Sequence, residues 1–113
     1  MDEPRKVQLR AERRGDNVRY LDARLDTEGN LHIGGHDLGP RTAVVSADGE
    51  YEWDRTIRAE HLGRLIELLG GEPGESVLDT LERRWSGNPR SYELEALLRD
   101  DANEIPSELW TWP

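Results

Sequence analysis

The stretch that decides the fold runs from residue 49 to residue 57 and reads Gly49-Glu50-Tyr51-Glu52-Trp53-Asp54-Arg55-Thr56-Ile57. Bulky apolar side chains alternate here with charged or polar ones. A β-strand has a side-chain period of two, so this alternation predicts a strand with one buried and one acidic face. We expect Tyr51, Trp53 and Ile57 to face the core and the carboxylates to face the other way.

Shorter alternations on the N-terminal side of this stretch predict more strands. They cover residues 6–13, 18–26 and 31–36, with turn residues between them. Residues 42–46 fit either a short strand or a loop. With residues 50–57, the pattern predicts about four antiparallel strands within residues 6–57.

The apolar period changes to three and four after residue 57, which is typical of amphipathic helices. Helices are expected at about residues 59–70, 75–86 and 89–101, with a short turn at 105–110. Asn88 is a suitable N-cap and Pro89 a suitable first helical residue. Strands followed by helices indicate one α+β domain over residues 1–113, in which about three helices (about 59–110) pack on one face of the sheet.

The composition excludes several classes of protein. The 113 residues carry a net charge of −9, which disfavours nucleic acid as a partner, and the absence of cysteine excludes disulfides and thiolate metal sites. No apolar run approaches the ~20 residues that cross a bilayer, so no membrane association is expected. The first residues lack the apolar core of a signal peptide, and a cytoplasmic location is the expectation.

His32, His36 and Asp37 form the densest group of candidate metal ligands. The two histidines share a face of a regular strand but would lie ~13 Å apart, too far for one ion. The double glycine between them can shorten that distance, and Asp54 or His61 is a possible third ligand. Exposed or structurally bonded histidines are the simpler interpretation, so we predict no metal and no cofactor.

The acidic strand face favours a binding role. Charges on alternate positions of one strand repel one another unless arginines or a basic partner lie opposite. We therefore predict a basic protein partner. The residues expected to bind it are Glu50, Glu52, Asp54, His36, Asp37 and Trp112.

The four tryptophans divide into two groups. Trp53 and Trp85 fall on predicted apolar faces and are expected in the core, and Trp110 is expected to cap the core under the helices. Trp112 is either an interface anchor or part of a frayed end.

No motif of a known catalytic class is present, and no single carboxylate is marked as buried, so the chain is not predicted to be an enzyme. The alternative is a small metal- or ligand-dependent enzyme centred on His36, Asp37 and Asp54.

Three segments carry a resemblance: Gly35-His36-Asp37-Leu38-Gly39-Pro40, Glu50-Tyr51-Glu52-Trp53 and Leu69-Gly70-Gly71-Glu72-Pro73-Gly74. In these the chain resembles a group of short actinobacterial proteins, over roughly residues 20–110. That resemblance implies no activity, cofactor or site residue. In size and acidity the chain is also similar to toxin-immunity proteins, many of which neutralise basic nucleases.

Overall fold

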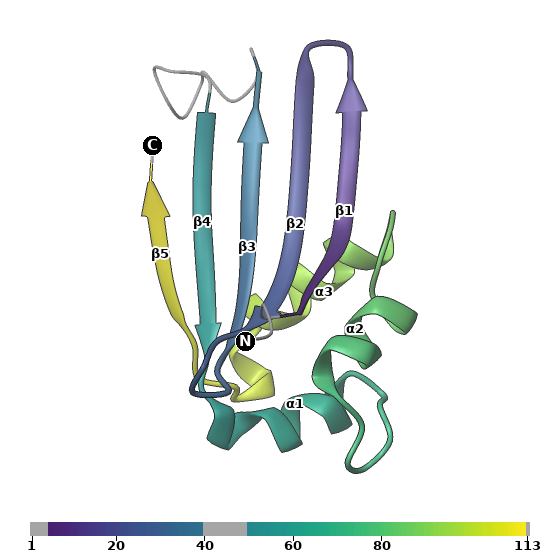
Figure 1. Cartoon of the computed structure of the whole chain (residues 1–113), viewed down its shortest axis with the longest axis vertical. Helices are drawn as coiled ribbons and strands as arrows, with labels where there is room; N and C mark the ends of the chain where they lie inside the picture. Colours follow the sequence, from purple (N-terminus) through teal and green to yellow (C-terminus); the bar gives the residue numbers. More distant parts are fainter. Residues whose placement is uncertain (1–4, 40–49, 113) are drawn as a thin grey trace.

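The computed structural model describes residues 5–39 and 50–112 (Figure 1). Within these ranges five strands form a single antiparallel sheet in the order β1-β2-β3-β4-β5. The strands are β1 (Lys6–Arg14), β2 (Asn17–Leu25), β3 (Leu31–Leu38), β4 (Glu50–Ile57) and β5 (Glu108–Trp112). The segment 42–46, for which strand and loop were both considered, lies outside the described residues.

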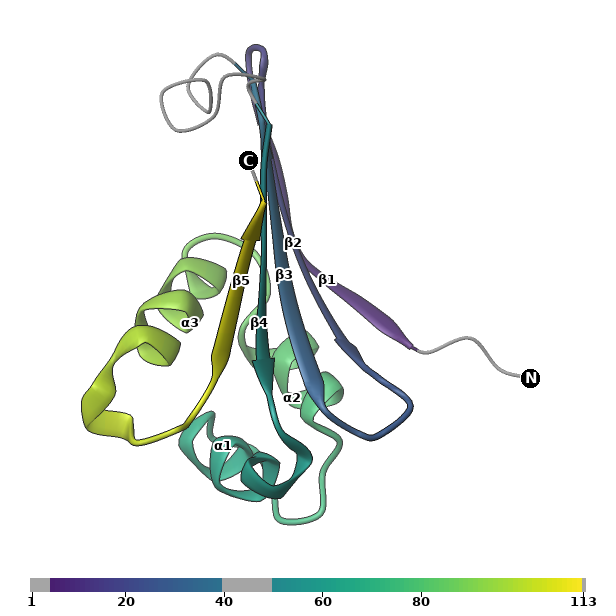
Figure 2. The same ribbon diagram turned by 90° about the vertical axis from the view of Figure 1, so that its left-hand side faces the viewer.

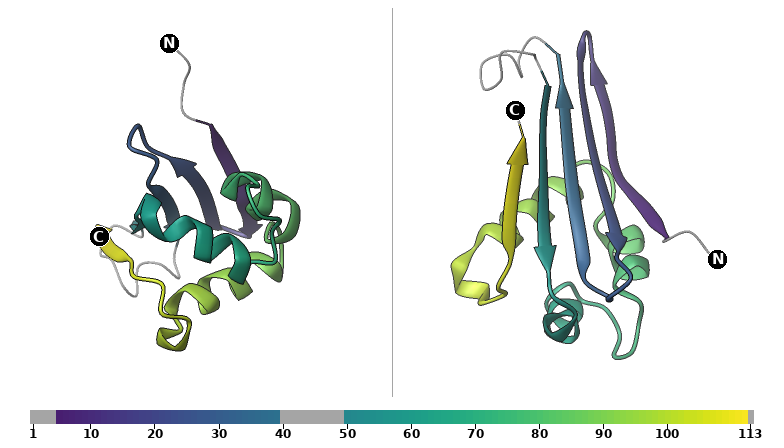
Figure 3. Two further views of the ribbon diagram at one scale, coloured as in Figure 1. Left: turned by 90° about the horizontal axis from the view of Figure 1, so that it is seen from below. Right: turned by 60° about the vertical axis from the view of Figure 1, so that its left-hand side comes forward.

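The helices follow β4 and lie on one side of the sheet (Figures 2 and 3). They are the 3₁₀ turn η2 (Ala59–His61), α1 (Leu62–Leu68), α2 (Val77–Arg84), α3 (Arg90–Arg99) and the 3₁₀ turn η3 (Asp101–Asn103). The β1–β2 turn extends past them, so the far end of the sheet is not covered by helices (Figure 2). The prediction of an α+β fold with helices on one face is confirmed. We call the side under the helices the covered face and the other side the open face.

The core lies between the covered face and the helices. Its fully buried side chains include Leu21, Leu31, Ile33, Ile57, Leu65, Leu78, Leu81 and Leu94. Trp85 is 8% exposed, and its indole N–H donates to the carbonyl of Leu69 at 2.9 Å, which satisfies the polar atom of a buried aromatic ring. Trp53 is partly buried and packs against the same core. Both were expected there.

Strand β4 has the two faces that its alternation predicts. Ile57 is fully buried and pairs with Leu31, while Tyr51 and Trp53 are partly buried on the covered face. The carboxylates of Glu50, Glu52 and Asp54 lie on the open face, where they contact the histidines of β3.

Strand β1 departs from simple alternation. Its register with β2 shifts between Gln8 and Arg10, so Leu9 and Arg10 are both buried and Ala11 is exposed. A β-bulge moves every later side chain to the other face. Arg10, at 6% exposure, therefore lies under α3, where it donates to Ser91 at 3.0 Å and pairs with Glu95 at 2.6 Å.

The double glycine in β3 causes no bulge, because the register with β4 runs without interruption from Leu31 to Leu38. Gly35 lies beneath the Trp53 indole: a β-carbon there would come within 2.1 Å of Trp53 Nε1. At Gly34 a β-carbon would lie on the open face, where it would meet only the Trp53 carbonyl oxygen at 3.7 Å. The close approach at Gly35 is made by the chain's own tryptophan.

The last strand adds a fifth member to the predicted sheet of about four strands within residues 6–57. Residues 108–110, expected to belong to a short turn, instead begin β5, which pairs with β4 from Glu52↔Trp112 to Thr56↔Glu108. A five-residue strand carries little periodicity, and its partner lies some fifty residues earlier. Trp110 was expected to cap the core, but its side chain is 62% exposed.

The helices agree with their predicted positions but not with every predicted cap. Pro89, rather than Asn88, is the N-cap of α3, and it makes no side-chain capping bond. The Asn88 amide instead donates to Glu12 at 3.2 Å, tying the helix start to β1. Gly70, at φ +82°, follows the C-cap Leu69 of α1 in the left-handed conformation that is common just after a helix.

Candidate functional site

The candidate site lies on the open face, where β3 supplies histidines and β4 supplies carboxylates. Cross-strand partners in an antiparallel sheet share a face. The register places His36 opposite Glu52, Gly34 opposite Asp54 and Leu38 opposite Glu50. Three of the six predicted site residues are thereby brought together by pairing two strands that are separated along the chain.

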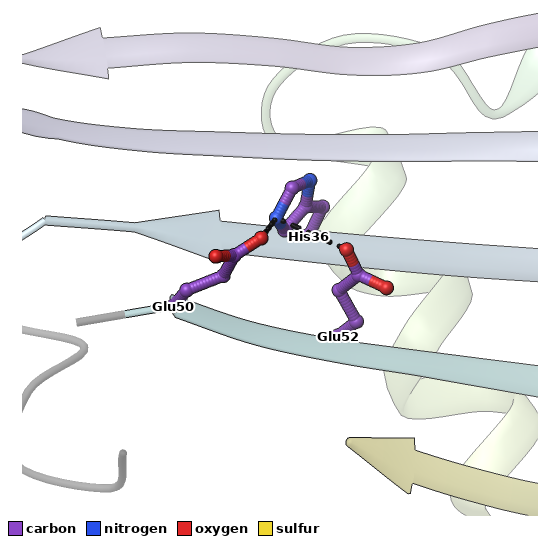
Figure 4. A group of neighbouring side chains, drawn as sticks. All are labelled: His36, Glu50 and Glu52. Atoms are coloured by element: carbon purple, nitrogen blue, oxygen red, sulfur yellow. Dashed lines mark hydrogen bonds and ion pairs between the residues drawn. The ribbon is translucent and has the colours of Figure 1, made fainter. Parts of the chain in front are cut away.

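His36 lies between two glutamates, and we call this group the His36 cluster (Figure 4). Its Nε2 is 2.7 Å from Glu50 Oε1 and 3.3 Å from Glu52 Oε1. The side chains of Glu50 and Glu52 are 46% and 49% exposed, and that of His36 is 33% exposed. The cluster is therefore preformed and also open to solvent.

The charge of the His36 cluster is not balanced within the described part of the chain. There, neither glutamate has a lysine or arginine partner, and both turn toward the same ring nitrogen. Like charges on one sheet face are destabilising unless a cation compensates them. The three ligand atoms lie within 4.8 Å of one another, so the cluster can accept a proton, a cationic side chain or a metal ion.

His32 is also bound by two carboxylates, but through both ring nitrogens. Nε2 is 2.8 Å from Asp26 Oδ2 and Nδ1 is 3.0 Å from Asp54 Oδ1. Its side chain is 18% exposed, and Arg24 approaches Asp54 from β2 at 3.8 Å. With no ring nitrogen left for an external ligand, His32 joins the β2–β3 turn to β4 and has a structural role.

Asp26 is held by the turn as well as by His32. Its side chain accepts the backbone N–H groups of Glu28 and Asn30 at 2.9 and 3.0 Å, forming an Asx turn. The bond to His32, followed by these backbone bonds, lowers the pKa of Asp26 from 3.8 to about 2. The carboxylate is therefore kept ionised far into the acid range.

Asp37 does not join the His36 cluster, because neighbouring residues of a strand point to opposite faces. It faces the helices, where burial raises its pKa and the Arg19 guanidinium opposes that effect. Asp54 lies opposite Gly34 and is bound to His32, which is two residues away along β3. The predicted enzyme centre of His36, Asp37 and Asp54 is thus not assembled in this structure.

The two C-terminal tryptophans lie on the edge strand beside these carboxylates. Trp112 takes the register position opposite Glu52 and Trp110 the position opposite Asp54. Trp110 shares the open face and is well exposed. The prediction that Trp112 anchors a partner concerns its side chain, which lies outside the described part of the structure although its backbone belongs to β5.

A shallow hollow separates the two histidines. It has a volume of about 320 Å³ and is formed where Gly34 has no side chain, with Asp22, His32, His36 and Asp54 among its walls. Lys6 and Arg24 line it on the β1 and β2 side. The hollow joins the His36 cluster to the rest of the open face and can admit a small polar group.

No protein-family model, curated protein or solved structure matches the chain. Among the described helices, none combines the length and apolarity needed to span a membrane.

Two features of the site were missed in the sequence. The Asx turn at Asp26 has a local signature, an Asp followed by Thr-Glu-Gly-Asn, that could have been recognised. The pairing of His36 with Glu50 and Glu52 has no local signature, because it requires the order and register of two strands.

Proposed function

We propose that the protein is a binding module whose open face docks a basic protein partner. The observation that carries this proposal is the pair Glu50 and Glu52: both are nearly half exposed, and neither has a lysine or arginine partner among the described residues. A partner that brings lysine or arginine side chains to this face would supply the missing cations.

Charge would act mainly on the encounter, and an apolar contact would add stability. An acidic surface speeds association with a basic protein through long-range attraction. Trp110, 62% exposed on the same face, is an aromatic anchor of the kind that dominates interface energetics. The immunity-like form of the proposal, in which the partner is a basic toxin, is supported only by acidic charge and small size.

The proposal is tested by affinity capture from extract of the native cell, with identification of the captured proteins. Four proteins are compared: the wild type, Glu50→Gln/Glu52→Gln, Trp110→Ala and the control Glu60→Gln/Glu104→Gln. The control removes the same charge from side chains that are 70% and 75% exposed elsewhere on the surface.

The expected result is a basic protein that the wild type and the control retain and that the other two variants lose. Its retention should fall as salt rises toward ~1 M, where the Debye length shrinks to ~3 Å. Equal recovery by Glu50→Gln/Glu52→Gln, or no specific protein at low salt, would sink the proposal.

A further inference from the structure

The chain offers few ligands to a metal ion that prefers nitrogen. It has no cysteine and only three histidines. His32 has both nitrogens engaged by carboxylates, and His61 has a single carboxylate among the described residues, Glu60, at 3.5 Å. Counting only contacts between described residues, His36 alone of the three has two carboxylates converging on one nitrogen.

The spacing of the His36 cluster is close to that of a metal coordination sphere. Metal–nitrogen and metal–oxygen bonds of ~2.0–2.2 Å place neighbouring ligand atoms roughly 3.0–3.5 Å apart at octahedral or tetrahedral angles. The distances from His36 Nε2 to the two carboxylate oxygens are 2.7 and 3.3 Å. The three ligand atoms all lie within 4.8 Å of one another, so side-chain adjustment alone could bring them around one ion.

The charge and the chemistry of the ligands point to the same class of ion. Two carboxylates without lysine or arginine partners in the described chain present two negative charges, which a divalent cation neutralises. Imidazole with carboxylates suits zinc, cobalt and nickel, whereas calcium and magnesium prefer sites made only of oxygen.

We propose that His36 Nε2, Glu50 and Glu52 bind one divalent transition-metal ion of the zinc class. Three protein ligands leave at least one coordination position open, as in catalytic rather than closed structural sites. His36 and Glu52 also line the hollow over Gly34. The proposal uses the same two carboxylates as partner docking, but it can be tested by itself because all three ligands lie within this chain.

The test uses the untagged full chain, with Zn²⁺ titrated calorimetrically and Co²⁺ monitored by its visible absorption. We expect one equivalent of metal per chain. His36→Ala should weaken binding by more than the ~10–100-fold that loss of a supporting outer partner costs, because it removes a direct ligand. Glu52→Gln preserves size and should weaken binding in the same direction.

His61→Ala is the matched control, since its side chain has the same 33% exposure as that of His36. It should leave the affinity unchanged. In NMR spectra, paramagnetic Co²⁺ should broaden the His36 ring signals before those of His61. Circular dichroism of each variant identifies any loss of fold.

Metal binding that His36→Ala leaves intact, or no binding by the wild type, would overturn the inference. Because no partner is present in this experiment, a negative result would leave the docking proposal standing. Failure of the wild type to capture a basic partner would, in turn, leave the metal-site proposal standing.

Discussion

The two faces of the sheet each hold a polar cluster, but they are completed in different ways. On the covered face, Arg10 bonds Ser91 and Glu95 and stacks on the Tyr92 ring at 3.6 Å. The Tyr92 hydroxyl donates in turn to Glu12, which lowers the pKa of that carboxyl. On the open face, Glu50 and Glu52 have only His36 as a cationic partner within the described part of the chain. The charged groups of the covered cluster are paired and hydrogen-bonded within the chain. The two glutamates of the open cluster keep negative charge that an external cation can neutralise.

Burial explains this difference. A charge away from water is tolerated only when it is paired and hydrogen-bonded, so the Arg10 group has to be complete for the helices to dock. The His36 cluster remains in contact with water, which screens its repulsion and removes that requirement. Incomplete pairing can therefore persist on the open face, where a ligand can use it.

The largest effect is expected from Arg10→Ala. It leaves Glu95, whose side chain is 19% exposed, without its partner, and should lower the free energy of unfolding by about 3 kcal/mol. His36→Ala, on the open face, should change it by less than about 0.5 kcal/mol. Urea unfolding of both variants measures the contrast. Similar losses in the two would show that the faces do not differ as we describe.

The adjacent glycines give a second comparison of the two faces. Gly35→Ala places a methyl group against the Trp53 indole and should cost about 1–3 kcal/mol through overpacking. Gly34→Ala adds the same methyl group to the open face, at ordinary contact distance, and should stay within about 0.5 kcal/mol. Denaturant unfolding gives the stability, and the Trp53 indole N–H resonance should shift in Gly35→Ala. An unperturbed indole with no loss of stability would contradict this packing.

The smallest effect concerns pH and the turn that holds His32. Asp26 has a pKa of about 2 in the folded protein against 3.8 ordinarily, so the folded state binds its proton more weakly than the unfolded chain does. Its contribution to stability is present above pH 3.8 and is lost as pH falls toward 2.

Urea unfolding in the acid range, compared between the wild type and Asp26→Asn, isolates this contribution from those of other carboxylates. The difference between the two proteins should shrink steadily as pH falls through that window. Glu28→Gln, an exposed position in the same turn, serves as the control. A difference that stays constant with pH would mean that the carboxylate charge is not what stabilises the turn.

Much of the architecture was predictable because its signals are local. The alternation around Trp53 identified both faces of β4, and the change of period after residue 57 identified the helical half. The bulge after Gln8 was not predictable, because Arg10 looks like a surface residue until α3 supplies Ser91 and Glu95. β5 was missed because its few residues carry too little pattern, and only the free edge of β4 makes them a strand.

By itself, the sequence determined that the chain forms an α+β domain with an acidic strand face and that its metal-binding chemistry is limited to histidine and carboxylate. Side-chain period and composition depend only on the order and types of residues along the chain, so they can be read without a structure. Only the tertiary structure decided that His36, not Asp37 or Asp54, belongs with Glu50 and Glu52. That choice follows from strand register, because a shift of one residue would move each of these side chains to the opposite face.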